Sequence, residues 1–345
     1  MMSLSLGHRD AGIVALESAS LIVLNVVSLL GNTAICLAVY RNKQLRTITN
    51  LYIIALAICD LTSAVIVMPS SSVVLVKGEW IFGDVFCNLQ GFFVVMNIYA
   101  SPCLMTLTAI NRYVRICRAG IYHKLFSKRK SMLWIFAVYA TVTAYIVTQV
   151  LVGNQKIQFV SGYAVCSTTH LGETAKLIHY SIIVPAFVVG PIILTTLCYY
   201  KVFRCIRRHN KDFATSLRTG SSAALSISRR ELRVSISLFV VVIVFAFCWI
   251  PLWILALLFR FQLVDSLSRH VTLFIMFLVF ISSTVNPFIY AGMNTSFRRE
   301  FGRIANFCSP PSEQESSSLQ LGQLKKITDE EQRNKSVCSE ELNAV

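Results

Sequence analysis

Seven apolar segments, each at least 20 residues long, dominate this chain of 345 residues. A helix of about 20 apolar residues crosses the hydrocarbon core of a bilayer. Lipid offers backbone groups no hydrogen-bond partner, so each segment is expected to be a membrane-spanning helix. The segments lie at 15–40, 48–76, 84–117, 130–152, 177–206, 234–260 and 270–292. The sequence therefore predicts an all-α fold, a seven-transmembrane helix bundle.

The net charge of +15 is unevenly distributed along the chain. An odd number of spans places the two termini on opposite sides of the membrane. If the N-terminus is outside, the inner loops and the tail hold 26 of the 32 lysines and arginines, as the positive-inside rule requires. We therefore expect a multi-pass plasma-membrane protein with an extracellular N-terminus and a cytoplasmic C-terminus. The basic excess indicates this topology and contact with the lipid bilayer, and we expect no nucleic-acid partner.

The spans divide the chain into four expected parts. A short extracellular N-terminus at 1–16 precedes the bundle at 17–293. Aromatic residues alternate with arginines at 294–308, which predicts an amphipathic helix on the inner membrane surface. Cys308 at its end is a candidate palmitoylation site. The polar remainder, 309–345, is expected to be a disordered cytoplasmic tail with candidate phosphorylation sites.

Two of the eleven cysteines, Cys87 and Cys166, lie at or beyond the outer membrane surface. The others lie in spans, at the inner ends of spans or in the tail, so this pair alone faces an oxidising compartment. We therefore predict one disulfide bond, Cys87–Cys166. It would tie the start of the third span to the loop between the fourth and fifth spans.

Polar and helix-bending residues inside the spans indicate more than a passive anchor. Of the 17 acidic residues, Asp60 alone lies deep within a span, and an intramembrane carboxylate is a candidate functional group. The alternative is a neutral aspartic acid that is hydrogen-bonded within the bundle. Six of the eight prolines also lie in spans, and proline kinks a helix. This pattern favours a bundle that bends when it works.

A set of short motifs marks the spans: Gly31-Asn32, Leu56-Ala57-x-x-Asp60, Trp80 before Cys87, Asn111-Arg112-Tyr113, Trp134, Pro191 with Tyr199, Phe245-x-x-Cys248-Trp249-x-Pro251 and Asn286-Pro287-x-x-Tyr290. In this order they resemble the rhodopsin-like (class A) G protein-coupled receptors. The resemblance covers 15–308 and implies a receptor, not an enzyme, that binds an extracellular small-molecule ligand. It also implies that the cytoplasmic side opens to activate a heterotrimeric G protein, and that arrestin and receptor kinases bind the tail.

The sequence leaves two other functions open. A receptor of the same fold for a peptide or a lipid is the first alternative. A multi-span transporter, which belongs to a different class of protein, would show internal repeats or broken helices in matched halves of the chain. We find neither feature in the sequence.

The resemblance implies a switch at the cytoplasmic end of the bundle. Its residues are Asn111, Arg112, Tyr113, Tyr199, Glu231, Asn286, Pro287 and Tyr290. Arg112 would pair with Glu231 at rest and turn toward Tyr199 on activation. Separating a charge pair near a low-dielectric interior costs free energy. The pair would therefore favour the resting state of a bundle that has two states. The family usually has an acid before the arginine; because Asn111 is neutral, we expect a looser resting pair and some ligand-independent activity.

The resemblance also implies two binding sites in the bundle. A sodium ion that stabilises the inactive state would bind to Asp60, Ser101, Ser283 and Asn286, whose oxygens suit a hard cation; no other cofactor or metal is expected. The positions that face the ligand in the family are Val94, Val95, Ile98, His170, Phe187, Trp249, Leu252, Trp253, Ala256, Met276 and Phe280. Val94 offers no counter-ion to a protonated monoamine, and Phe280 cannot form a retinal Schiff base. This set predicts a neutral, apolar or aromatic ligand.

The stretch from Ala109 to Cys117 also resembles melatonin receptors, which likewise have asparagine before the arginine. Elsewhere the chain departs from them: it has Pro287 in place of their alanine, Ala144 in place of their fourth-span asparagine and Phe187 in place of their fifth-span histidine. His170 replaces their loop glutamine. The resemblance therefore favours an inhibitory G protein but does not favour melatonin as the ligand.

Two further details concern the surroundings of the ligand. His170, His179 and His270 lie near the outer mouth and are either pH sensors or, more simply, surface histidines. Pro102 stands where the family usually has a small aliphatic partner for Phe245, and it is expected to kink the third span.

Overall fold

The computed structural model describes residues 6, 9–219, 229–261, 263–264 and 268–308. Side chains are described in these ranges except at 209–219, 229–233, 259–260 and 307–308. The chain forms two compact units, Met1–Phe301 and Gly302–Val345. The helix bundle lies within the first unit, and the described part of the second unit is helical.

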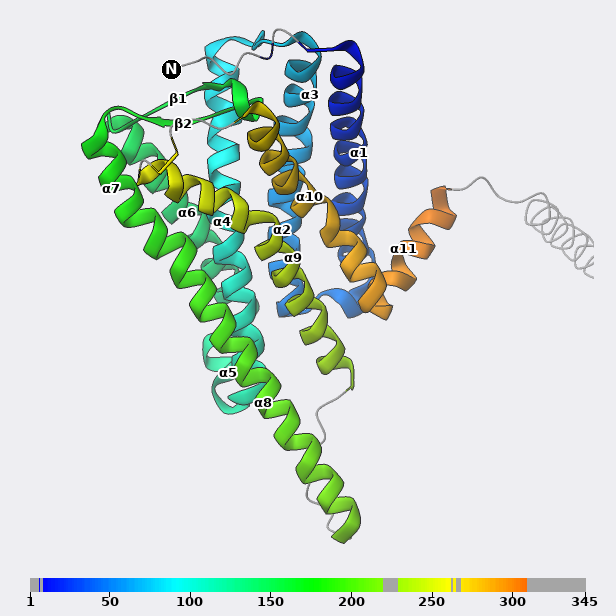
Figure 1. The fold of residues 1–345 in the computed structure, drawn as a ribbon. Coiled ribbons are helices and arrows are strands. Elements are labelled where there is room, and N and C mark those ends of the chain that lie inside the picture. The colour runs from blue at the N-terminus through cyan, green and yellow to red at the C-terminus, as the bar shows by residue number, and fades with distance from the viewer. Residues whose placement is uncertain (1–5, 7–8, 220–228, 262, 265–267, 309–345) are drawn as a thin grey trace, which may run out of the picture. The chain divides into compact units, whose positions relative to one another are not determined.

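Seven helices among the described residues are long and apolar enough to cross a membrane. In the second and fifth spans a short π-helical stretch, Ser63–Val67 or Val184–Val189, joins two α-helices. The spans are α1 (Ala11–Arg41), α2 and α3 (Ile48–Thr62 and Met68–Lys77), α4 (Gly83–Cys117), α6 (Lys128–Leu151), α7 and α8 (Glu173–Ile183 and Gly190–Thr219), α9 (Arg229–Arg260) and α10 (Arg269–Met293). They form one bundle (Figure 1), which confirms the predicted seven-helix all-α fold.

We call the end of the bundle at which α1 begins the N-side, and the end at which α1 finishes the C-side. The first helix starts at Ala11, inside the stretch that was expected to be an N-terminal tail. The reason is a helix cap: the Asp10 carboxylate accepts a hydrogen bond of 3.0 Å from the Gly12 backbone nitrogen. Such a cap satisfies one of the free N–H groups at a helix start.

The third span, α4, is the central helix of the bundle. In its most apolar stretch of 18 residues, 72% of the residues are buried, compared with 17% in the corresponding stretches of α1 and α6. Helices α2, α6 and α8 all pack against it. A side chain on α4 is therefore within reach of several other helices, which is why the predicted sites concentrate on this helix.

A β-hairpin lies across the N-side of α4 (Figure 1), in the segment between the fourth and fifth spans. Its strands, β1 (Gln155–Val160) and β2 (Val165–His170), are antiparallel, and Cys166 pairs with Phe159. The predicted disulfide between Cys87 and Cys166 is confirmed, with Cα atoms 5.4 Å apart. This bond anchors the hairpin to the start of α4.

Two shorter helices lie next to spans at the C-side. α5 (Ala119–Leu125) follows α4, and α11 (Thr295–Cys308) follows α10 almost over the range expected for the amphipathic helix. Phe297 of α11 is 0% exposed and packs against Tyr290, with ring centroids 5.8 Å apart. The side chain of Cys308, the candidate palmitoylation site, lies outside the described residues.

Helices α1 and α10 approach closely at Gly31. A Cβ atom built on Gly31 would lie 2.6 Å from the Pro287 Cγ and 2.9 Å from its Cβ. The ring of Pro287 therefore occupies the space that any other residue at position 31 would need. Two of the motifs read from the sequence, one in the first span and one in the seventh, meet at this contact.

We predict that Gly31→Ala destabilises the protein, because the added methyl group overpacks a close contact at a cost of about 1–3 kcal/mol. The thermal unfolding midpoint of the purified protein should fall by several degrees. Gly120→Ala is the matched control, since a Cβ on this helical glycine meets nothing within 4 Å and alanine is the better helix former. Equal midpoints for the two variants would contradict the packing argument.

Candidate functional site

A chain of hydrogen bonds at the C-side holds the predicted switch arginine. Arg112 lies in the last turns of α4, is only 3% exposed and donates to the hydroxyl of Thr49 in α2. The same hydroxyl donates to the amide oxygen of Asn111 over 3.1 Å. The amide nitrogen of Asn111 donates to the Tyr122 hydroxyl of α5 over 3.3 Å. Arg112 therefore joins α4 to α2, and the neutral residue before it ties both helices to α5.

Other predicted switch residues lie around a small cavity at the C-side. Tyr199 of α8 and Tyr290 of α10 both line it, and they are only 1% and 2% exposed. The hydroxyl of Tyr199 makes no hydrogen bond to any residue that the structure describes. The side chain of Glu231, the expected partner of the switch arginine, lies outside the described residues. That pair therefore stays a prediction.

Tyr113, the third residue of the arginine motif, faces the fifth span. The ammonium group of Lys201 on α8 lies 5.5 Å from the centroid of its ring. A cation at this distance is attracted by the electrons of the aromatic face. The contact adds a direct link between α4 and α8 at the C-side.

The predicted sodium ligands meet inside the bundle. Asp60 of α2 is 4% exposed, and its carboxylate accepts a hydrogen bond of 2.9 Å from the amide nitrogen of Asn286 on α10. Ser101 of α4 and Ser283 of α10 line the same cavity as this pair. Carboxylate, hydroxyl and amide oxygens from three spans therefore surround a common space, and this donor set fits a hard cation.

Asn97 is a polar residue of this region that was not predicted from the sequence. It lies on α4, four residues before Ser101, so the two side chains share one face of the helix. Its amide nitrogen donates to the Ser63 hydroxyl over 2.7 Å, and both residues line the cavity around Asp60. An amide within an apolar segment, one turn from a predicted ligand, is the signal that would have identified it.

The cavity around Asp60 extends to the predicted ligand positions. Its lining includes five of those positions: Val94, Ile98, Trp249, Met276 and Phe280. The indole nitrogen of Trp249 donates to Ser282 of α10 over 2.9 Å, and the indole ring stacks on Phe245 with centroids 4.9 Å apart. These five ligand positions and the predicted sodium ligands therefore line one cavity.

The remaining predicted ligand positions are more dispersed. Phe187 and Trp253 line a second cavity between α4, α8 and α9. Val95 is 2% exposed and packs in the same apolar cluster as Phe187. Leu252 packs against an apolar cluster that includes Val94, Met276 and Phe280 of the first cavity. Ala256 is half-buried. Seven of the eleven predicted positions therefore line one or both of these two cavities.

Pro102 does not interrupt the third span, because α4 continues through it as one helix of 35 residues. The hydroxyl of Thr106 hydrogen-bonds the Pro102 carbonyl oxygen over 2.9 Å and lies 3.1 Å from the hydroxyl of Thr195 on α8. Pro102 and Phe245 line the same cavity. The proline is therefore part of the contact region between α4, α8 and α9.

Two histidines form a largely buried cluster at the N-side. His179 of α7 is 5% exposed, and its ring centroid lies 4.6 Å from that of His170 on β2. Its Nδ1 lies 2.6 Å from the Gln155 amide nitrogen and 2.8 Å from the Tyr145 hydroxyl, and its Nε2 lies 3.3 Å from the Tyr99 hydroxyl. Because the amide nitrogen only donates, a neutral ring carries its proton on Nε2. The interpretation of His179 as a surface histidine is therefore wrong.

His170 should make the stability of the protein depend on pH. Burial lowers the pKa of His170, the nearby charge of Lys176 lowers it further, and Glu173 opposes the shift. Because the folded protein prefers the neutral ring, the contribution of His170 to stability is fully present above about pH 6.5, the pKa of a histidine in the unfolded chain. It is lost as the pH falls below that value toward the lowered pKa.

We expect the thermal unfolding midpoint to fall when the pH is lowered from about 7 to about 5.5, because these two values bracket the pKa of a free histidine. The fall should be smaller in His170→Gln. His270→Gln, which removes an exposed histidine, is the control and should behave like the unaltered protein. An unchanged pH dependence in His170→Gln would contradict the assignment.

Comparisons with known proteins agree with this arrangement. Residues 31–290 match the family model described as "7 transmembrane receptor (rhodopsin family)". Melatonin receptor type 1C of Xenopus laevis is 28% identical over 306 residues, which cover 86% of this chain and 69% of that receptor. Melatonin receptor type 1A of Gallus gallus is 29% identical over 311 residues, which cover 88% of this chain and 84% of that receptor. Squid rhodopsin shares the fold, with a TM-score of 0.74 at 20% identity over 91% of this chain and 92% of its own. The chain belongs to the rhodopsin family of seven-transmembrane receptors.

Proposed function

We propose that this protein is a G protein-coupled receptor whose ligand site includes the cavity around Asp60. The observation that carries the proposal is the lining of that cavity, which combines ligand positions such as Met276 and Phe280 with the intramembrane Asp60. Trp249 belongs to the same lining and is hydrogen-bonded to α10. A ligand that displaces Trp249 therefore changes the contact between α9 and α10.

The proposed ligand is a neutral, apolar or aromatic small molecule. Val94 provides no counter-ion for an amine, and most of the ligand positions are apolar or aromatic. The Nε2 of His170 has no hydrogen-bond partner among the described residues, so it suits a ligand that carries one donor. The two relatives above are named as melatonin receptors. We do not propose melatonin itself, because Ala144 and Phe187 replace the polar residues expected for it.

A lipid-like ligand is the second candidate within the same receptor class. The lining of the second cavity, which Phe187 and Trp253 share, includes Ile192 and Ile250, which are 50% and 44% exposed on the bundle surface. Since that part of the surface would face hydrocarbon, an apolar molecule dissolved in the membrane has access to it. Trp249 lines this cavity as well, so a ligand there would act on the same residue.

Activation is proposed to open the C-side of the bundle. At rest Arg112 is bound to Thr49, and Glu231 is its proposed second partner. On opening, Arg112 turns toward Tyr199, whose buried hydroxyl lacks a partner among the described residues; such a group is costly to keep unpaired. Because Asn111 adds no negative charge beside the arginine, we propose that the resting state is weakly held and that the receptor has basal activity.

The proposed orientation places the N-side outside the cell, in keeping with the distribution of lysine and arginine. α5 and α11 then lie on the cytoplasmic side of the plasma membrane, where a heterotrimeric G protein of the inhibitory class would bind. Arrestin and receptor kinases are the proposed partners of the tail. Palmitoylation of Cys308 would hold the end of α11 at the membrane.

A panel of neutral indoles, lipids and short peptides, scored for G protein dissociation in cells that express the full chain, tests the receptor proposal. We expect a flat apolar compound to be active and peptides to be inactive. Trp249→Ala should weaken the binding of the active compound by about 2 kcal/mol, roughly thirtyfold in affinity. Trp134→Ala is the matched control, since Trp134 is 47% exposed on the bundle surface. Activity of peptides alone would overturn the proposed ligand class.

Sodium is proposed to bind beside Asp60 and to stabilise the resting bundle. The thermal unfolding midpoint should be higher in sodium chloride than in potassium chloride of equal concentration, by about 2–4 °C for each 1 kcal/mol of stabilisation. The difference should disappear in Asp60→Asn and persist in Asp84→Asn, which alters an exposed carboxylate at the start of α4. Identical midpoints in the two salts would argue against the site.

A further inference from the structure

A pocket on the N-side of the bundle lies apart from the cavities described above. It is bordered by the start of α4, by strand β1 and by the residues that follow α6. Its polar lining residues are Asp84, Asn88, Lys156 and Gln158. Among the described residues, no member of its lining also lines the cavity around Asp60 or the second cavity. The pocket is therefore a separate site.

Asp84 of α4 and Lys156 of β1 bring opposite charges to this pocket without neutralising each other. Both side chains are exposed. Neither of them takes part in the ion pairs that join the described residues. The carboxylate and the ammonium group are therefore available to a ligand that carries both a positive and a negative charge.

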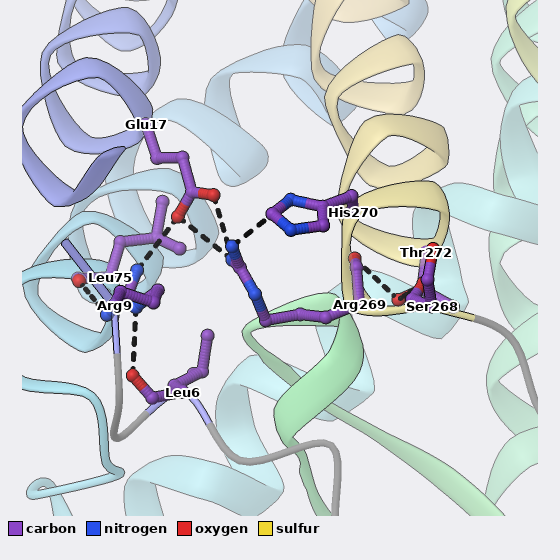
Figure 2. A network of polar contacts seen from close by, with 8 residues as sticks. All are labelled: Leu6, Arg9, Glu17, Leu75, Ser268, Arg269, His270 and Thr272. Atoms are coloured by element: carbon purple, nitrogen blue, oxygen red, sulfur yellow. Dashed lines mark hydrogen bonds and ion pairs between the residues drawn. The ribbon is translucent and has the colours of Figure 1, made fainter. Parts of the chain in front are cut away.

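The other charged cluster at the N-side differs, because its charges already contact each other (Figure 2). The carboxylate of Glu17 on α1 accepts from Arg9 over 2.8 Å and from Arg269 on α10 over 2.8 and 3.0 Å. The three side chains are at most 13% exposed. That cluster ties α1 to α10 and offers little to a ligand, whereas the charges of the pocket are open to solvent.

Apolar side chains lead away from the pocket along the outer surface of the bundle. Val150 lines the pocket in the last turn of α6, and Val147, one turn earlier, is 43% exposed. On α4, Val85 and Leu89 are 86% and 45% exposed. Acyl chains cover such surface on a span, and indole rings like that of Trp80, which also lines the pocket, are typical of the membrane interface. The pocket therefore lies at the level of the lipid head groups.

The hairpin approaches α4 closely enough to form one wall of the pocket. A Cβ atom built on Gly91 of α4 would lie only 2.4 Å from the Cγ2 of Ile157 on β1, and Ile157 is part of the lining. The disulfide between Cys87 and Cys166 anchors the neighbouring strand to the same stretch of α4. The two charges of the pocket are thus carried by elements whose separation is fixed.

We propose that this pocket binds the head group of a zwitterionic phospholipid from the leaflet at the N-side. The ammonium group of the lipid binds Asp84, its phosphate binds Lys156, and its acyl chains lie along the exposed apolar surface of α4 and α6. The bound lipid braces β1 against α4. Gln155 of β1, which also lines the pocket, connects this strand to His179. The inference does not depend on the proposed receptor function.

The charges of the pocket select among lipids. An anionic phospholipid without an ammonium group would place its negative charge near Asp84 unbalanced, and an uncharged sterol would leave both charges unused. A soluble zwitterion would gain only exposed ion pairs, which contribute little to binding. The combination of two charges with an adjoining apolar surface therefore favours a lipid.

Native mass spectrometry of the purified full-length protein tests the site. The detergent micelles contain phosphatidylcholine and phosphatidylglycerol in equal amounts, and the occupancy of each bound lipid is measured. We expect Asp84→Asn and Lys156→Gln each to lower phosphatidylcholine occupancy about threefold, the size expected for loss of one exposed ion pair. Lys77→Gln and Glu79→Gln remove exposed charges that do not line the pocket. They are the matched controls and should bind phosphatidylcholine like the unaltered protein.

Unchanged phosphatidylcholine occupancy in the folded Asp84→Asn and Lys156→Gln variants would overturn the site, and so would an equal fall in the two controls. If one of the pocket variants fails to fold, the other decides. Glycerophosphocholine, the same head group without acyl chains, should not displace the lipid at equal concentration; displacement would overturn a lipid as the occupant. Since the readout needs no G protein, failure here is distinguishable from failure of the proposed function, in which no compound of the panel would cause G protein dissociation.

Discussion

Polar groups inside this bundle must find partners within the protein, because the hydrocarbon core of a bilayer offers none. Backbone groups do so within each helix, whereas several buried side chains do so across helices. The amide of Asn32 donates to the Ser283 carbonyl oxygen over 3.0 Å, and that of Asn286 donates to Asp60 over 2.9 Å. These bonds connect α1 and α2 to α10 at defined positions along the helix axes. They fix the register in which the apolar faces, including the close contact at Gly31, pack together.

The central helix α4 joins the regions to which the proposed function assigns a role. Its N-side end carries the disulfide to the hairpin, its middle carries Asn97 and Ser101 at the polar cavity, and its C-side end carries Arg112. One rigid element therefore borders all three. The other helices can change their packing around it while these groups keep their spacing along α4. Such a division between a fixed axis and movable neighbours suits a two-state bundle.

The spans and the disulfide could be predicted because they depend on local apolarity, length and compartment. Asp60 itself could be predicted from its place inside a span. Its grouping with Ser101, Ser283 and Asn286 could be predicted only through the family resemblance. The bonds of His179 to Gln155 and Tyr145 could not, because they depend on which faces of α6, α7 and the hairpin meet. The same applies to Thr49, which lies 63 residues from Arg112 along the chain. Spans that are apolar on every side carry little information on which face turns inward.

The hydrogen bonds of Asn111 have a consequence for how such receptors diverge. Asparagine and aspartate have nearly the same shape, and the Thr49 hydroxyl donates to a side-chain oxygen that both possess. The Tyr122 hydroxyl, which accepts from the asparagine, is equally able to donate to an aspartate. Exchange of one residue for the other would therefore change the charge beside Arg112 while the bonding pattern stays in place. Under the activation scheme proposed above, such a replacement would change resting activity without a compensating change elsewhere in the fold.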